Sequence, residues 1–203
     1  MQNFEFLRIS YTAKIKETGQ EFDKSEDSPV ILGAGYLIKG LEEALKGMKE
    51  GEERTIEIPP EKGFGKRDPN LIKLVSESEF KRHGTKPSPG MIVQADNLRG
   101  KVLSVSSGRV RVDFNHPLAG KTLIYNVKIK KKLEEIEDKV KAIVEVYTRI
   151  KKGKVKVIEK EVEIEIPPLI NPVFKKKIAD EIMRLLGFEK IRFIEVFEKP
   201  KKE

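Results

Sequence analysis

Three separated segments of this 203-residue chain carry side chains that could line one small apolar pocket with a single carboxylate. Phe22 and Asp23 place an aromatic ring beside an acid at a predicted strand end. The segment 32–45 holds a glycine turn followed by a short predicted helix, and in the segment 59–65 two glycines frame Phe64. Such a pocket would bind an apolar group and hold one charged oxygen beside it.

The order, spacing and residue types of these segments resemble the FKBP-type peptidyl-prolyl cis/trans isomerases. The stretch from Leu71 to Phe114 resembles the insert of the SlyD-like subgroup of that family. The resemblance covers residues 1–133, and the remainder is similar to the tail domain of long-chain archaeal members. It implies an α+β fold: an antiparallel half-barrel sheet with a short helix, an inserted small β-rich domain, and a C-terminal α+β domain.

The resemblance also implies a pocket. The eight matching residues are Tyr11, Phe22, Asp23, Leu37, Ile38, Leu41, Phe64 and Tyr125. In that pocket, the rings of Phe22, Phe64 and Tyr125 would surround the proline, and Leu41 would form the floor. Leu41 stands where many members carry Trp, and Phe64 replaces the usual Tyr. These departures predict a softer pocket that lacks one hydroxyl group.

The same resemblance gives the polar groups their roles. Asp23, hydrogen-bonded to Tyr11, would lie at the pocket rim and polarise the twisting amide, while the N–H of Ile38 would bind the peptide backbone. Each of the eight predicted pocket residues, taken alone, is more typical of an ordinary protein core. The joint match across 1–133 favours the pocket.

Other chemistries find little support in the sequence. Prolyl isomerisation needs neither a nucleophile nor a metal, and we expect no cofactor and no metal ion. The chain has no cysteine, and its two histidines, His83 and His116, are far apart, so a structural zinc site is not expected. The glycines of 33–40 lack the spacing of a nucleotide-binding loop.

The amino-acid composition limits which binding partners and which cellular compartment we expect. The net charge of +8 invites a nucleic-acid interpretation, but Lys and Glu are interspersed as on solvated faces, a pattern that suggests a thermophile. Nucleic acid is therefore an unlikely partner. No apolar run is long enough to span a membrane, and the first residues lack the features of a signal peptide. Together with the absence of cysteine, this predicts a cytoplasmic protein.

Hydrophobic periodicity predicts the elements that position the pocket. Alternation over 4–16 and 122–133, and short apolar runs at 30–32 and 54–58, predict a sheet with one helix over 38–48. Three strands, 91–95, 101–105 and 109–114, are expected to follow a brief helix. We therefore predict an isomerase domain of 1–70 and 116–133 and an insert of 71–115.

The last part, 134–203, is expected to form a third domain. Two strands, 140–150 and 155–166, are predicted to form a hairpin, followed by a helix from Pro172 to Gly187 and a strand over 191–197. The positions of Ile143, Val157, Ile164, Ile194 and Val196 indicate apolar residues on both faces of this small sheet, which predicts a homodimer through 134–203. Packing against the isomerase domain of the same chain is the open alternative.

Three functions compete at this stage. The first is an isomerase that is also a folding chaperone, with unfolded or partly folded proteins containing X-Pro bonds as partners. The second is a holdase chaperone or binding module with little isomerase activity, and the third is a ribosome- or RNA-associated protein that uses its basic surface. The small insert cannot bury all its apolar residues, so we expect it to bind unfolded segments.

Overall fold

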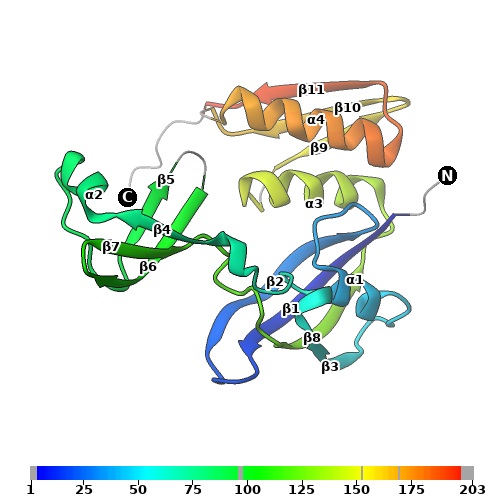
Figure 1. The fold of residues 1–203 in the computed structure, drawn as a ribbon. Coiled ribbons are helices and arrows are strands. Elements are labelled where there is room, and N and C mark those ends of the chain that lie inside the picture. The colour runs from blue at the N-terminus through cyan, green and yellow to red at the C-terminus, as the bar shows by residue number, and fades with distance from the viewer. Residues whose placement is uncertain (1–3, 96–97, 152, 169, 198–203) are drawn as a thin grey trace, which may run out of the picture. The chain divides into compact units, whose positions relative to one another are not determined.

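The computed structural model describes residues 4–95, 98–151, 153–168 and 170–197 (Figure 1). The chain divides into two compact units, Met1–Glu57 with Ile124–Glu203, and Ile58–Leu123. Within the described residues, no helix is both long and apolar enough to cross a membrane.

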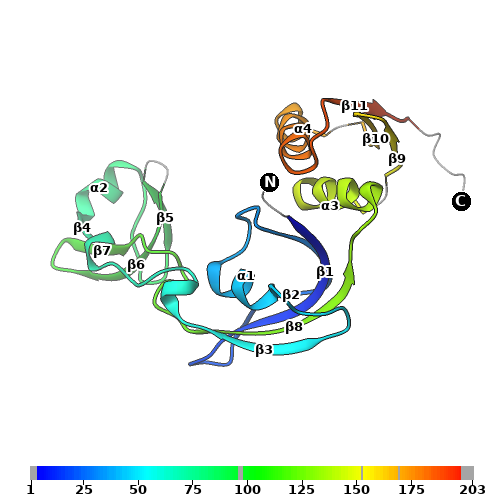
Figure 2. The same cartoon turned by 90° about the vertical axis from the view of Figure 1, so that its right-hand side faces the viewer.

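A curved four-stranded sheet forms the base of the first unit. Its strands, in spatial order, are β2 (Glu21–Leu32), β1 (Glu5–Ile15), β8 (Leu123–Lys132) and β3 (Glu53–Ile58). Helix α1 (Lys39–Leu45) lies in the hollow of this sheet (Figure 2). The predicted alternation of β1 is confirmed, because Leu7, Ile9 and Ala13 are buried. The apolar run predicted at 30–32 is the end of a longer strand, β2, which also holds Phe22 and Asp23.

The second unit contains another four-stranded sheet, which adds β4 (Ile72–Ser76) to the three strands predicted for the insert. Its order is β4 (Ile72–Ser76), β7 (Arg109–Asp113), β6 (Leu98–Ser106) and β5 (Ile92–Ala95), with every neighbouring pair antiparallel. Helix α2 (Glu77–Arg82) follows β4, and short 3-10 helices cover Pro60–Lys62 and Pro69–Leu71. Ser107 and Gly108 both have positive φ, which makes the tight turn between β6 and β7.

The segment 140–150 is a helix, so the strand predicted there is wrong. Helix α3 spans Ile136–Thr148 and packs against α4 (Pro172–Leu186), β2 and β9 (Val155–Ile158). Its many β-branched residues favour a strand by propensity. However, Val140, Ile143, Val144 and Tyr147 fall on one face at helical spacing, and the first three are buried. Packing of that face overrides the local preference.

The hairpin predicted between 140–150 and 155–166 is also wrong. The segment 155–166 is itself an antiparallel hairpin of β9 (Val155–Ile158) and β10 (Glu161–Ile166), because Glu159, at φ 50°, turns the chain within it. Strand β11 (Lys190–Glu195) lies within the strand predicted over 191–197, apart from its first residue, and pairs parallel with β10. Helix α4 (Pro172–Leu186) begins where Asn171 Oδ1 accepts the Val173 N–H at 2.8 Å. It ends at Gly187, which adopts the left-handed conformation.

The expectation that apolar residues lie on both faces of this sheet is wrong for three of the five residues that suggested it. Ile143 lies on α3, and Val157 and Ile164 belong to the core. The outer face of β10 instead carries acids paired with bases of neighbouring strands: Glu161 with Lys190, Glu163 with Arg192, and Glu165 with Lys154. Ile194 remains 41% exposed.

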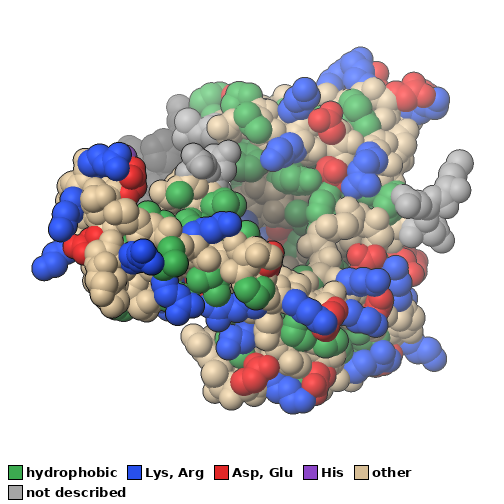
Figure 3. Space-filling model, in the orientation of Figure 1, with side chains coloured by type: hydrophobic (Ala, Val, Ile, Leu, Met, Phe, Trp, Pro, Cys, Tyr) green, Lys and Arg blue, Asp and Glu red, His purple; other side chains and the backbone are tan. Residues whose placement is uncertain are grey.

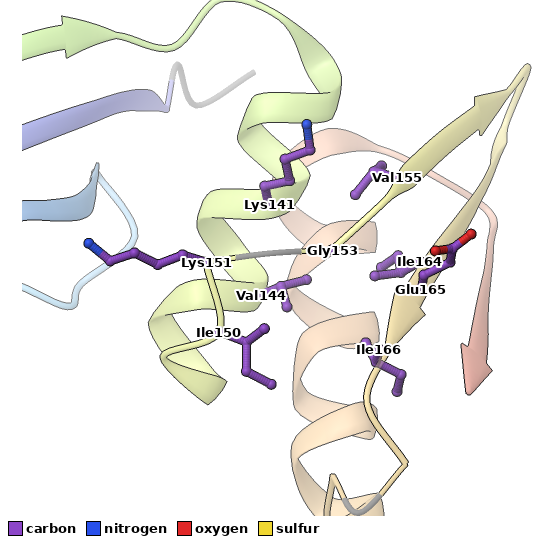
Figure 4. Close-up of a pocket in the computed structure, with 9 residues that line it drawn as sticks. All are labelled: Lys141, Val144, Ile150, Lys151, Gly153, Val155, Ile164, Glu165 and Ile166. Carbon is purple, nitrogen blue, oxygen red and sulfur yellow. The ribbon is translucent and has the colours of Figure 1, made fainter. Parts of the chain in front are cut away.

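The predicted C-terminal domain shares a core with the N-terminal sheet of the same chain, and both belong to one compact unit. Phe6, Ile31 and Leu133 belong to the same buried cluster as residues of α3, β10 and α4. A small apolar cavity of about 10 Å³ lies between α3, β9 and β10 (Figure 4). The α3 face of this domain therefore packs within the same chain, which was the open alternative to a homodimer.

Candidate active site

Strands β1 and β2 bring Tyr11 and Asp23 together. The Tyr11 hydroxyl donates a hydrogen bond to Asp23 Oδ2 at 2.9 Å. The antiparallel register, which pairs Ala13 with Asp23 and Tyr11 with Ser25, places the two residues diagonally across the strands. Burial, aided by the bond to Asp23, raises the pKa of Tyr11 above its usual value. Tyr11 therefore stays a hydrogen-bond donor at neutral pH.

Tyr125 of β8 joins this pair and Phe22 into an aromatic cluster. Its ring centroid lies 6.0 Å from that of Tyr11 and 6.1 Å from that of Phe22, the latter at 79° between planes. Tyr125 is buried, and burial raises the pKa of its hydroxyl to about 12. The structure thus assembles one polar pair and two further rings from β1, β2 and β8.

The start of α1 supplies the three aliphatic positions. Ile38 precedes the helix in an extended conformation, and its carbonyl accepts the N–H groups of Leu41 and Glu42 at 3.1 Å. In the described part of the chain no group accepts a hydrogen bond from the Ile38 N–H. Leu37 and Ile38 are half-buried, and Leu41 is buried. An N–H free of intramolecular partners can bind a substrate carbonyl.

Phe64 lies in the second unit, after the 3-10 helix Pro60–Lys62. Its ring stacks face to face on His116, with centroids 4.3 Å apart and 4° between planes. His116 Nδ1 accepts the Leu118 N–H at 3.2 Å, so this histidine is engaged within its loop. No local pattern in the sequence indicates this stack, because the two partners are distant in the chain. That Phe64 completes the pocket wall stays a prediction.

The described residues contain no group of three or more His, Cys, Asp or Glu side chains arranged to hold a metal ion. The seven other predicted residues all belong to the first unit. Their arrangement offers an apolar surface, one carboxylate and a free backbone N–H. These groups can bind and polarise an amide.

Comparison with known proteins identifies the family. Residues 73–118 match the family described as FKBP26, IF domain. The chain is 41% identical over 117 residues to a short-type peptidyl-prolyl cis-trans isomerase of Methanocaldococcus jannaschii, covering 57% of this chain and 74% of the relative. It is 39% identical over 121 residues to a probable FKBP-type 16 kDa peptidyl-prolyl cis-trans isomerase of Pseudomonas fluorescens, covering 56% and 79%.

The chain belongs to the FKBP-type peptidyl-prolyl cis-trans isomerases. A SlyD relative from Treponema pallidum is 33% identical over 144 residues, covering 68% of this isomerase and 81% of the relative. The resemblance inferred from the sequence is therefore confirmed, as is the predicted α+β fold. The roles of the eight pocket residues in this isomerase are taken up below as a proposal.

Proposed function

We propose that this isomerase rotates X-Pro bonds of unfolded or partly folded proteins in a pocket lined by the eight predicted residues. The observation that carries the proposal is the hydrogen bond from Tyr11 to Asp23 beside the ring of Tyr125. It supplies a fixed carboxylate next to apolar rings. Phe64, in the second unit, would complete the wall.

The barrier to rotation about a peptide bond is roughly 18–20 kcal/mol, most of it lost resonance. A twisted amide is less dipolar than a planar one, so a site that excludes water binds it more tightly. Asp23 would polarise the twisting amide, and the Ile38 N–H would hold the substrate backbone in register. No covalent intermediate, metal or cofactor takes part in this mechanism.

Refolding of a protein limited by prolyl isomerisation tests the proposal. We expect catalytic amounts of the full chain to accelerate the slow phase. The second candidate, a holdase with little isomerase activity, is favoured by the exposed apolar residues of the insert, and would slow or block refolding without accelerating it. A slow phase that is unchanged or slower would contradict the isomerase.

We further propose that the insert, 71–115, binds unfolded client segments. Leu74, Ile92 and Leu98 are each more than half exposed, and β4 and β5 are the edge strands of the insert sheet. At the left of Figure 3, hydrophobic side chains of the insert lie exposed among lysines and arginines. An extended peptide could pair with such an edge.

A homodimer through 134–203 remains our proposal for the assembly. Among the described residues of this domain, the large apolar side chains that remain exposed are Val146, Ile158, Val173, Phe174, Met183, Ile194, Val196 and Phe197. Phe197, at 79% exposed, gives the sharpest test. By sedimentation equilibrium we expect the full chain to be a dimer and Phe197→Asp to weaken it by about tenfold or more, since interface aromatics are common hot spots. A monomeric wild type, or an unaffected dimer, would contradict this interface.

The remaining assignments are also proposals. The domains would be 1–70 with 116–133, 71–115 and 134–203. We place the protein in the cytoplasm of a thermophile, of archaeal type, since it lacks cysteine and carries charged ladders on its C-terminal sheet. Nucleic acid is not proposed as a partner.

A further inference from the structure

A polar cleft of about 340 Å³ opens in the first unit, between β1, β2 and the end of α3. Tyr11 and Asp23, the proposed pocket rim, belong to its lining. So do Lys24 of β2 and, from the C-terminal domain, Arg149 and Lys151. The cleft therefore adjoins the proposed isomerase site and is bounded by a domain to which no role at that site has been assigned.

Two of the acids around the cleft, Asp27 and Glu145, are already paired with cations. Arg8 binds Asp27 at 2.6 and 2.7 Å and Glu145 at 2.9 and 3.2 Å. Lys151, whose side chain extends away from β9 and β10 (Figure 4), lies 3.5 Å from Asp27 and 3.8 Å from Glu145. The hydrogen bond from Arg8 lowers the pKa of Asp27, so this cluster stays charged and internally paired. A third acid, Asp23, accepts the bond from Tyr11.

Arg149 is the cation of the cleft that has no carboxylate partner among the described residues. Its backbone is left-handed, with φ 59°, and its N–H caps α3 by donating to the Glu145 carbonyl at 2.8 Å. Glycine adopts this conformation more readily than arginine does. The guanidinium lies close enough to Tyr11 to act on it electrostatically. A strained position that carries an unpaired charge at a cleft points to a ligand.

The end of α3 is fixed relative to the proposed pocket by two contacts. Glu145, only 8% exposed, is held by Arg8 of β1. Tyr147 packs edge-on against Tyr36, with ring centroids 6.4 Å apart and hydroxyl oxygens 3.2 Å apart. Tyr36 directly precedes Leu37 of the pocket. Arg149 thus lies at a helix end that contacts β1 through Glu145 and the segment before α1 through Tyr147.

We propose that this cleft is a substrate subsite, in which Arg149 binds an acidic side chain of the client near the isomerised proline. The proposal rests on the proposed function, because the proline must first occupy the pocket at Tyr11 and Asp23. An extended peptide advances about 3.3 Å per residue, so residues within two or three positions of the proline reach the cleft. A single arginine with a planar fork of donors suits a carboxylate.

The test uses the full chain and pairs of short prolyl peptides that differ by Glu against Gln. The pair is scanned through the three positions on each side of the proline. We expect the ratio of kcat/KM for the Glu peptide to kcat/KM for the Gln peptide to reach about three at one position in low salt. This is the size of effect that an exposed ion pair has. The ratio should fall towards one at about 0.5 M salt, where charges are strongly screened.

Variants at Arg149 decide the assignment. Arg149→Gly suits the left-handed backbone, so its thermal midpoint should not fall, and the Glu/Gln ratio should drop to about one. Arg149→Glu should bring the ratio below one. The matched control, Lys176→Ala, removes an exposed positive charge from α4 and should keep the wild-type ratio.

A wild-type ratio near one at every position, or a preference that survives in Arg149→Gly, would overturn the subsite while leaving the isomerase intact. An equal loss of preference in Lys176→Ala would also overturn it, because general attraction by the positive chain would then explain the effect. A wild type that turns over none of the peptides would overturn the proposed function itself, and the subsite with it.

Discussion

Replacing Asp23 by Leu should lower kcat/KM for prolyl peptides by about tenfold, because a hydrogen bond to a charged group contributes roughly 1.5–3 kcal/mol. The substitution removes both the acceptor for Tyr11 and the proposed polarising charge. Phe64→Ala should lower turnover several-fold, by removing one wall of the proposed pocket. A protease-coupled tetrapeptide assay measures both effects.

Conservative variants separate the effect of the hydrogen bond between Tyr11 and Asp23 from the effect of the Asp23 charge. Asp23→Asn keeps an oxygen acceptor for Tyr11 but loses the charge, whereas Tyr11→Phe keeps the charge but loses the donor. Asp180→Leu, at an exposed acid of α4, is the matched control and should leave turnover unchanged. If Asp23→Leu retains both full turnover and an unchanged circular dichroism spectrum, Asp23 does not belong to the site.

Deleting the insert, 71–115, should reduce catalysis on an unfolded protein by about tenfold or more, through loss of the local concentration that client binding provides. Tetrapeptide turnover should stay within about twofold, because a peptide this short needs no second binding surface. The deletion can be closed by a short glycine-serine linker. Ile72 pairs with Asp113 across β4 and β7, so the two ends are about 5 Å apart.

Full-chain variants provide the control for this deletion. Serine at Leu74, Ile92 and Leu98 together removes exposed apolar side chains without changing the chain length. It should reproduce the loss on the unfolded protein and spare the tetrapeptide. Equal losses on both substrates would mean that the insert only supports the pocket.

Local signals in the sequence were sufficient for most of the strands and for α4. The cap at Asn171, the stop at Gly187 and the turn at Ser107-Gly108 each specify a backbone conformation by themselves. Alternation over β1 likewise predicted which side chains would be buried. These features depend on near neighbours in the chain, which a single sequence displays.

What the sequence could not supply depends on distant partners. The β-branched residues of α3 favoured a strand, and only the packing of its apolar face against α4, β2 and β9 decides for a helix. The Arg8–Glu145 pair, and the stack of Phe64 on His116, join residues that no local pattern connects. In the pocket, Tyr11 and Asp23 were predicted together through the family resemblance. Arg149, outside that resemblance, was not.

The pairing of β4 with β7 has a consequence for how the chain folds. In the N-terminal sheet β8 lies between β1 and β3, so late and early parts of the chain must meet, and closing such long loops slows folding. The insert hairpins, β5–β6 and β6–β7, are local and can form early. Once β4 has joined β7, Asp68 and Asn115 are held together by hydrogen bonds at 2.8 and 2.9 Å. A folded insert thereby shortens the effective loop between β3 and β8, and so would serve as a nucleus for the domain that it interrupts.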